Sequence, residues 1–401
     1  MRQDTQPRIL IVRLGAMGDI LHALPAVTAL RAAHPGLSID WAVEPRWRAL
    51  LAADSAGPDV ALSPAQPLVD HIHLVPAKEW SRRPLHPATA LSILRTRSAM
   101  RAGHYDATLD LQGAIRSAVI ACWAHAPRLL GEAEPREPFA RYLFKERIPS
   151  RGIHVIEQSA DVVRALFGDP LPLALPLLPH DAIAARWCSE QGVPADFPLS
   201  ILLHPGAGWG AKRWPADRYA RAAALVAEHS GARVVINAAP GELGLAEALA
   251  RELHTLGVEP LLLAPTVGQL IELTRRVTLA IGGDTGPLHL AAALGKPTVG
   301  IFGPTDPARN GPFHAHFRVL RDPGSRRDHT RHRDPEAGLL RIQPEPVAEA
   351  ALELLFGSGT ASGAHGAQGN AGIPPQPATN ASANTTDHLD PLTRNTVGLA
   401  P

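Results

Sequence analysis

One short stretch near the start of the chain places a carboxylate where a strand gives way to a helix. The stretch is "LGAMGDILHAL", residues 14–24, and it follows the apolar run "ILIV". Its acid, Asp19, can cap the helix, ligate a metal ion or accept a proton from a substrate. The helix dipole favours the ionised form, which is a weak base unless proton transfer is late and concerted. The residues by themselves leave capping and proton transfer both open.

A second stretch, "HPGAGWGAKRWPADRY", combines glycines with two cations after an apolar strand. Glycines at such a point leave backbone N–H groups free to face an anion. We therefore expect a diphosphate site in which Lys212 neutralises charge on a leaving group. The alternative is a flexible surface loop with solvated cations. The helix that follows is expected to begin at Trp214 and Pro215, with proline in its first turn.

A third stretch, "AIGGDTGPLHLAAALGKPTVGIFGPTDP", again ends a strand on paired glycines. Asp284 or Thr285 can cap the next helix, and Gly295 can end it. The amides of Thr285 and Gly286, with His289 one turn in, would then face the strand ends and form a diphosphate-sugar pocket. The alternative is that Asp284 only caps and His289 is a satisfied, half-buried histidine. Two anion-friendly loops in one half favour a nucleotide.

Several function classes are not expected. No P-loop, G-x-G-x-x-G, H-E-x-x-H or D-x-D pattern is present, so we expect neither a metal site nor another cofactor. The net charge of +1 over 401 residues does not indicate nucleic-acid binding. The two cysteines, Cys122 and Cys188, are far apart and fit a reducing compartment. No apolar run is long enough for a signal peptide or a transmembrane segment, so any membrane association is expected to be peripheral.

The elements that must position these residues alternate along the chain. Strands are expected at "RILIVR", "SIDWAV", "HIHLV" and "DATLDL", with helices over 18–34, 90–102 and 114–126. The pattern restarts at "LSILLH" and continues with "ARVVIN", "EPLLL", "VTLAIGG" and "PTVGIFG", separated by helices over 216–229, 241–256, 267–276 and 286–294. This alternation predicts an α/β protein with two parallel, doubly wound sheets.

The proline-rich stretch "GDPLPLALPLLPHD" marks the join between the two halves. We expect domains over 1–175 and 176–356, with ligands bound at the carboxyl ends of the strands in the cleft between them. Residues 357–401 are rich in Gly, Ser, Ala, Asn, Thr and Pro, which predicts a disordered tail.

Four motifs together resemble the lipopolysaccharide heptosyltransferases, glycosyltransferase family 9. They are "MGDILHALPAV", "DLQGAIRSA", "HPGAGWGAKRWP" and "GGDTGPLHLAAALGKPTVGIFGPTDP", in the expected order between about residues 8 and 356. The resemblance implies a GT-B fold of two Rossmann-like domains, the first for the acceptor and the second for the nucleotide sugar. It further implies an inverting, metal-independent transfer of heptose from ADP-heptose to the Kdo of the lipid A inner core.

The resemblance also implies roles for individual residues. Asp19 matches the general base and Lys212 the lysine on the donor phosphates. Donor binding is assigned to Gly206, Lys212, Glu242, Asp284, Thr285, Gly286 and His289, with the match of Glu242 to a ribose-binding acid the loosest. The acceptor side is assigned to Gly18, His22, Gln112 and Arg116, where Arg116 could meet a carboxylate or phosphate.

Subtype and alternatives follow from the same motifs. "MGDILHALPAV" and "DTG" look closest to heptosyltransferase I, whereas "PGAGWGAKRWP" looks more like the second enzyme, which acts on an already heptosylated acceptor. A transferase using another nucleotide sugar, such as a hexose donor, would keep the same phosphate loops. A third hypothesis is a degenerate paralogue that only binds a nucleotide.

The expected location is the cytoplasm, peripheral to the inner face of the cytoplasmic membrane. The arginines of "SRRDHTRHRD", residues 325–334, are expected in a solvated loop, with contact to an anionic acceptor as the alternative.

Overall fold

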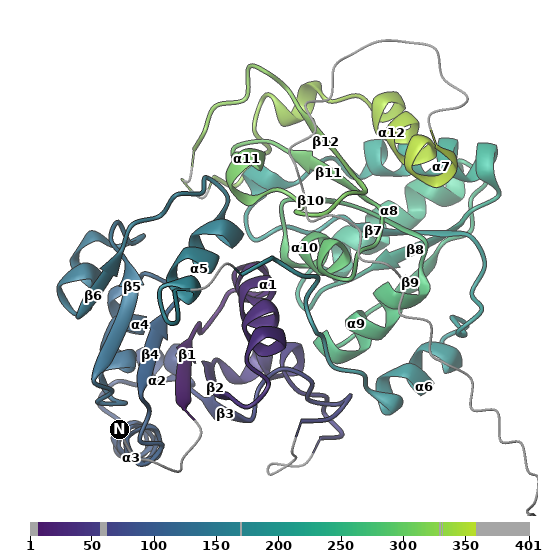
Figure 1. The fold of residues 1–401 in the computed structure, drawn as a ribbon. Helices are drawn as coiled ribbons and strands as arrows, with labels where there is room; N and C mark the ends of the chain where they lie inside the picture. The colour runs from purple at the N-terminus through teal and green to yellow at the C-terminus, as the bar shows by residue number, and fades with distance from the viewer. Residues whose placement is uncertain (1–6, 57–61, 169–170, 329, 331, 358–401) are drawn as a thin grey trace, which may run out of the picture.

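Two six-stranded parallel sheets, each covered by helices, form the protein (Figure 1). The computed structural model describes residues 7–56, 62–168, 171–328, 330 and 332–357. The predicted tail at 357–401 lies outside this part of the chain except for Gly357. The prediction of an α/β protein with two doubly wound sheets is confirmed.

The first sheet has the strand order β3-β2-β1-β4-β5-β6. Its elements, in chain order, are β1 (Arg8–Val12), α1 (Met17–Ala33), β2 (Ser38–Val43), the 3-10 helix η1 (Pro45–Leu50), β3 (His71–Leu74), α2 (Ala77–Arg82), α3 (Pro87–Ala102), β4 (Ala107–Asp110), α4 (Ile115–Cys122), β5 (Arg128–Glu132), η2 (Pro138–Tyr142), β6 (Glu146–Ile148) and α5 (Val155–Arg164).

The second sheet has the order β12-β11-β10-β7-β8-β9. Its elements are α6 (Ala182–Glu190), β7 (Ser200–His204), η3 (Gly210–Lys212), α7 (Ala216–Ser230), β8 (Arg233–Asn237), α8 (Leu243–Thr255), β9 (Leu261–Leu263), α9 (Val267–Arg276), β10 (Leu279–Gly283), α10 (Gly286–Ala293), β11 (Thr298–Phe302), α11 (Pro307–Asn310), β12 (Phe317–Arg321), η4 (Leu339–Arg341) and α12 (Pro344–Phe356).

The expected elements appear with small shifts, and a few details of their ends were wrong. The helix expected over 114–126 ends at Cys122. The helix after the second glycine loop begins at Ala216, so Pro215 is its N-cap rather than a first-turn residue. Strands β5, β6 and β12 had no prediction. β6 and β12 are sheet edges whose residues are half-buried or exposed, so they lack the apolar runs that mark buried strands.

Helix α1 lies at the boundary between the two domains, where it packs against α5 on its own side and α10 on the other (Figure 1). Thirteen of its residues are buried, so the helix is enclosed by protein on nearly all sides. One apolar cluster accordingly runs through both halves, from Ile11 and Leu24 to Leu202 and Leu290. The first turns of α1 and α10, and the residues they carry, are thereby held next to each other.

Candidate functional site

The site lies where the first turns of α1 and α10 meet across the domain boundary. Two glycines make this approach possible. A Cβ atom on Gly18 would lie 2.9 Å from Cδ2 of His289, and one on Gly286 would lie 2.8 Å from Cβ of Met17. Any side chain at either position would push the two helices apart. The structure thus brings Gly18, assigned to the acceptor side, against His289, assigned to the donor side.

A chain of polar contacts crosses the site. The Lys212 ammonium forms an ion pair with Oδ2 of Asp284 and also donates to the Asp284 carbonyl oxygen at 3.2 Å. The other carboxylate oxygen of Asp284 lies 2.9 Å from Nε2 of His289. On the far side of the same ring, Nδ1 of His289 lies 3.3 Å from Nε2 of His22. The cation of the second glycine loop is therefore connected to helix α1 of the first domain.

Burial and charge shift the pKa values along this chain in a consistent way. Burial by itself raises the pKa of Asp284, but the bond from His289 and the charge of Lys212 outweigh it, so the pKa lies well below its usual range. Burial lowers the pKa of His22 well below 6.5, and the neighbouring His289 and His154 lower it further. Asp284 is thus held as a carboxylate and His22 as a neutral ring.

The expectation that Asp284 or Thr285 caps α10 with its side chain is wrong. Thr285 occupies the N-cap position but makes no side-chain cap bond, and its hydroxyl donates instead to the Gly283 carbonyl at 3.3 Å. The Asp284 carboxylate is engaged by Lys212 and His289. The first-turn amides of α10 therefore receive no side-chain cap, which leaves a helix N-terminus of the kind that binds anions.

The loop that carries Lys212 is packed against neighbouring residues. Lys212 ends η3 and its side chain is only 10% exposed. Its ammonium lies 4.3 Å from the centre of the Trp209 ring. The backbone N–H of Ala211 donates to the His332 carbonyl at 3.2 Å, so part of the arginine-rich segment 325–334 packs on this loop. For Lys212, the alternative of a solvated loop cation is contradicted.

Glu242 and Gly206 lie in direct contact beside this loop. A Cβ atom on Gly206 would lie 1.7 Å from Oε2 of Glu242, so the carboxylate occupies the space that a side chain would need. Burial raises the pKa of Glu242, partly offset by the charge of Arg213 and by the backbone N–H of Ala207. Glu242, whose assignment from the sequence was the loosest, therefore lies against the glycine-rich loop.

Asp19 is the third residue of α1, and Ala16 is the N-cap. Its Oδ2 atom accepts the backbone N–H of Ala16 at 3.0 Å, and its Oδ1 lies 3.4 Å from the Arg13 guanidinium. The side chain is 39% exposed, so one face of the carboxylate stays open. Capping and proton transfer are therefore compatible: Oδ2 holds the helix start, while Oδ1 lies beside Arg13 and the carboxylate remains partly exposed to solvent.

The remaining acceptor-side assignments have different surroundings. Oε1 of Gln112 accepts the Leu14 backbone N–H at 2.8 Å, which ties the loop after β4 to the loop that leads into α1. Arg116 lies exposed in the first turn of α4. His22 is buried and its ring contacts His289.

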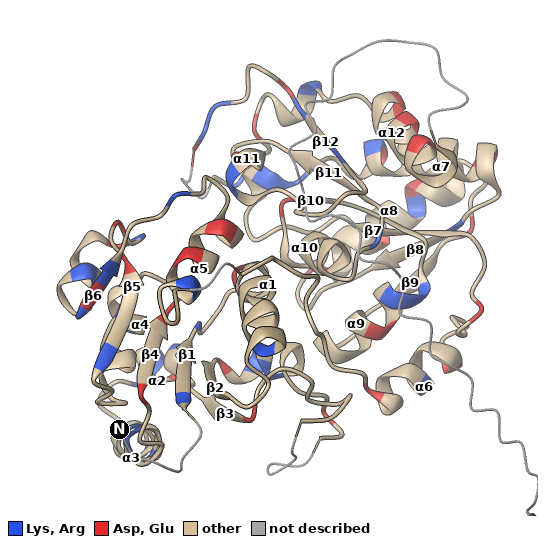
Figure 2. Ribbon diagram, viewed as in Figure 1, with Lys and Arg blue, Asp and Glu red and all other residues tan. Residues whose placement is uncertain are grey.

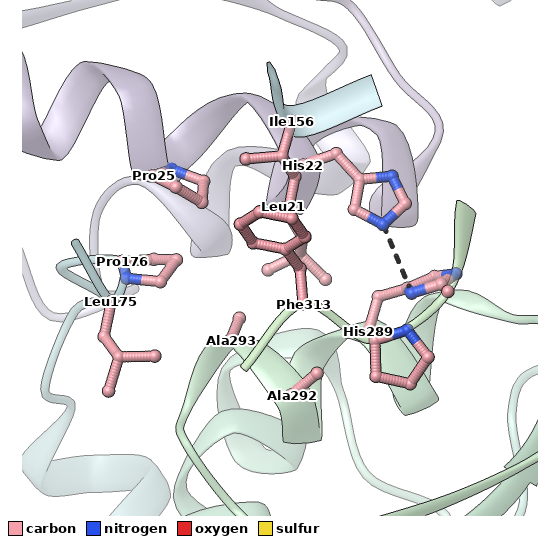
Figure 3. A pocket seen from close by; sticks show the side chains of 12 residues that line it. Leu21, His22, Pro25, Ile156, Leu175, Pro176, His289, Ala292, Ala293 and Phe313 are labelled. Carbon is pink, nitrogen blue, oxygen red and sulfur yellow. Dashed lines mark hydrogen bonds between the residues drawn. The ribbon is translucent and has the colours of Figure 1, made fainter. Parts of the chain in front are cut away.

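A small cavity lies beside the two histidines, between α1, α5, α10 and the linker (Figure 3). Its lining is mostly apolar and includes Leu21, Pro25, Ile156, Leu175, Ala293 and Phe313. His154 lies at the start of α5, with its ring centre 5.6 Å from that of His22, and its Nε2–H donates to the Gly311 carbonyl at 2.9 Å. Sequence analysis missed His154 and Phe313, because neither belongs to a motif.

Within the described ranges, no group of three or more His, Cys, Asp or Glu residues could hold a metal ion. No helix in this part of the chain is long and apolar enough to cross a membrane.

Comparison with known proteins shows the family. The sequence profile of glycosyltransferase family 9 (heptosyltransferase) matches residues 93–338. The chain belongs to glycosyltransferase family 9. Lipopolysaccharide heptosyltransferase 1 of Salmonella typhimurium is 30% identical over 312 residues, which cover 76% of this chain and 91% of that protein. This family 9 glycosyltransferase therefore matches its relative over both domains.

Solved structures confirm the GT-B fold of this family 9 glycosyltransferase. The Escherichia coli heptosyltransferase WaaC with ADP aligns with a TM-score of 0.69 at 24% identity, covering 86% of this chain and 99% of that one. The same enzyme with ADP-2-deoxy-2-fluoro heptose aligns with a TM-score of 0.67 at 25% identity and the same coverage.

Proposed function

We propose that this enzyme transfers heptose from ADP-heptose to the Kdo of the lipopolysaccharide inner core, with inversion and without a metal ion. The observation that carries the proposal is the meeting of Gly18 with His289. Asp19 is the next residue along α1 after Gly18, and His289 is hydrogen-bonded to Asp284, the partner of Lys212, which supports a site that combines the acid, the cation and the first turn of α10. The match to a heptosyltransferase 1 and the fold shared with an ADP-bound and a heptose-analogue-bound enzyme support the donor and the first-heptose subtype.

The proposed reaction is a single displacement at the anomeric carbon. The acceptor oxygen forms its bond to that carbon while the bond from carbon to the ADP oxygen breaks, which inverts the configuration. Asp19 takes the proton of the acceptor hydroxyl. ADP leaves as an anion, and Lys212 with the amides at the start of α10 stabilises the charge that develops on its phosphate. No separate acid is then required.

The remaining side chains bind and orient the two substrates. Asp284 and His289 hold Lys212 and the start of α10 in place, and the Glu242 carboxylate accepts hydrogen bonds from the ribose hydroxyl groups. Arg116, exposed on α4, contacts an anionic group of the acceptor. Because base and donor loops sit on different domains, domain closure completes the site. The enzyme works in the cytoplasm, at the inner face of the cytoplasmic membrane.

The deciding experiment compares two acceptors with ADP-heptose as donor. Kdo-lipid A is expected to accept heptose, and acceptor that already carries one heptose is expected to be a poor substrate. The reverse preference would make the protein a second heptosyltransferase. A thermal-shift screen of ADP-, UDP- and GDP-sugars tests the donor: stabilisation by a UDP- or GDP-hexose and not by ADP-heptose would overturn the donor assignment.

A further inference from the structure

Helix α3 has an unusual distribution of side chains for a helix of a globular domain. Of its sixteen residues, only Thr89 and Met100 are buried. Its two leucines point outward instead: Leu91 is 48% exposed and Leu94 is 59% exposed. Leu85, in the turn before the helix, is 96% exposed. The helix thus presents its leucines to solvent, and only Thr89 and Met100 are buried against the domain.

The charge of the same region is one-sided. Residues 80–105 contain five arginines and no aspartate or glutamate, although the whole chain is nearly balanced, with 39 basic and 38 acidic residues. All five are exposed: Arg82, Arg83, Arg95, Arg97 and Arg101. Within the described residues none of them forms an ion pair. Figure 2 shows acidic residues on elements of both domains, whereas α3 carries basic ones alone.

Helical geometry arranges the two kinds of side chain in a definite order. At 100° per residue, Leu91 and Leu94 lie on the outermost stripe of α3, opposite Thr89 and Met100. Arg95 lies on one flank of that stripe, and Arg97 and Arg101 lie on the other. An apolar stripe between basic flanks is the pattern of a helix that lies in the plane of a membrane surface.

We propose that the surface formed by residues 82–101 docks the enzyme onto an anionic lipid bilayer. The leucines would enter the boundary between headgroups and acyl chains, and the arginines would contact lipid phosphates. This inference deepens the proposed function, since an acceptor anchored in a membrane requires the enzyme to work at that surface.

The place of α3 in the fold suits this role. Met100 packs with Leu10, Val12 and Ala118 in a core cluster on one face of the first sheet. Helix α1 packs with Ile9 and Ile11 on the opposite face, because neighbouring residues of a strand point to opposite sides. The docking surface therefore belongs to the domain of Asp19 but lies on the face of the first sheet away from α1 and its contact with α10.

The charge of this surface distinguishes between the partners that could bind it: a second copy of the chain, a nucleic acid or a lipid bilayer. A second copy of this chain, docked symmetrically, would oppose the five arginines to five more, which is destabilising without acidic partners. A nucleic acid would satisfy the arginines but would leave the outermost leucines without a partner. An anionic bilayer satisfies both.

Binding of the full-length protein to vesicles tests the proposal. Vesicles of phosphatidylcholine and phosphatidylglycerol in equal amounts are expected to bind the protein in a salt-sensitive manner, and vesicles of phosphatidylcholine alone much more weakly. The variant with Arg95→Gln and Arg97→Gln is expected to bind the anionic vesicles roughly 25-fold more weakly, about fivefold for each arginine. The variant with Leu91→Asn and Leu94→Asn is expected to lose binding at least about tenfold.

The second domain offers matched controls. Arg221 and Arg251 are exposed on α7 and α8, and Leu243 and Leu256 are 48% and 41% exposed. The corresponding double variants to Gln and to Asn are expected to bind vesicles as the wild type does. Equal binding by α3 variants and controls, or no binding of the wild type to anionic vesicles, would overturn the docking surface. So would concentration-dependent self-association that the leucine variant abolishes, since the occupant would then be a second copy.

Activity measurements keep this inference separate from the proposed function. On a water-soluble acceptor stripped of acyl chains, the α3 variants are expected to retain wild-type turnover. On acceptor embedded in anionic vesicles they are expected to be slower by the same factor by which binding falls. A wild type that binds vesicles but transfers no heptose to either acceptor would refute the proposed function and leave the docking surface intact.

Discussion

Nε2 of His22 lies 3.3 Å from Nδ1 of His289, and this contact joins the first domain to the chain of polar groups that ends at Lys212. His289 thereby uses both ring nitrogens, one on Asp284 and one on His22. The orientation of the donor-side ring therefore depends on a residue of the opposite domain.

Replacing His22 tests that dependence. His22→Phe keeps an aromatic ring in the cavity but removes the hydrogen bond, which is worth about 0.5–1.5 kcal/mol. We expect the Kd for ADP to rise by roughly 2- to 12-fold, measured by calorimetry. Phe313→Leu changes the same cavity without touching the polar chain and is expected to leave the Kd nearly unchanged. Equal effects of both variants would reduce the histidine contact to cavity packing.

Asp19→Asn separates the two roles of this acid. The amide oxygen of Asn can still accept the N–H of Ala16, so the helix start is retained, but the side chain cannot take up a proton. We expect transfer to be abolished while ADP binding stays nearly intact. Asp19→Ala is expected to lose transfer as well and, in addition, about 0.5–2 kcal/mol of the free energy of unfolding. Normal turnover of the Asn variant would leave residue 19 as a helix cap only.

Lys212→Ala is expected to weaken donor binding and slow transfer together, because the phosphate charge is present in the ground state and grows in the transition state. It also leaves the buried Asp284 with His289 as its remaining partner. The measurements are the Kd for ADP and kcat with ADP-heptose. Lys296→Ala, whose ammonium donates to the Arg275 carbonyl outside the site, is the matched control. A Lys212 variant with normal Kd and kcat would show that the loop does not contact the phosphates.

Gly206→Ala is expected to reproduce the effect of Glu242→Ala. The new Cβ atom would need the position of the Glu242 carboxylate and would displace it. Both single variants are expected to weaken ADP binding to a similar degree. The double variant is expected to bind ADP as tightly as either single variant, since both substitutions remove the same interaction. Additive losses in the double-mutant cycle would mean that the two residues act independently. Gly208→Ala, where a Cβ meets open space, is the control.

Stability is expected to fall as the pH drops below about 6.5. Burial lowers the pKa of His22 well below its usual value, that of His154 to about 4, that of His204 to about 3 and that of His314 to about 4. Between these values and the unfolded value of 6.5, the unfolded chain binds protons that the folded chain does not, so lower pH favours unfolding.

Urea unfolding above and below pH 6.5 measures this dependence. Each histidine contributes a slope of up to about 1.4 kcal/mol per pH unit within its own window. His204→Gln removes one titrating ring and is expected to flatten the slope, while His229→Gln, on the exposed end of α7, is expected to leave it unchanged. If the free energy of unfolding depended on pH equally in the two variants, the lowered pKa of His204 would be contradicted.

Much of the fold could be predicted from local patterns. The buried strands β1 and β7 contain continuous apolar runs, and helices such as α9 have clear starts and ends, so their predicted bounds were close to those observed. The edge strands β6 and β12 were missed because half-buried strands carry a mixed pattern. The wrong cap assignment at Asp284 has a similar origin: capping is a local rule, but a tertiary ion pair with Lys212 engages this carboxylate instead.

The amino-acid sequence by itself determined that two strand–helix repeats exist, that glycine-rich loops follow their strands, and that Asp19, Lys212 and Asp284 stand at those loops. These features depend on near neighbours in the chain, so spacing reveals them. Only the tertiary structure decided that Lys212 pairs with Asp284, that Gly206 makes room for Glu242, and that His22 meets His289. Such contacts join residues up to 267 positions apart, and tertiary packing, both within the second domain and at the domain boundary, sets them rather than any local pattern.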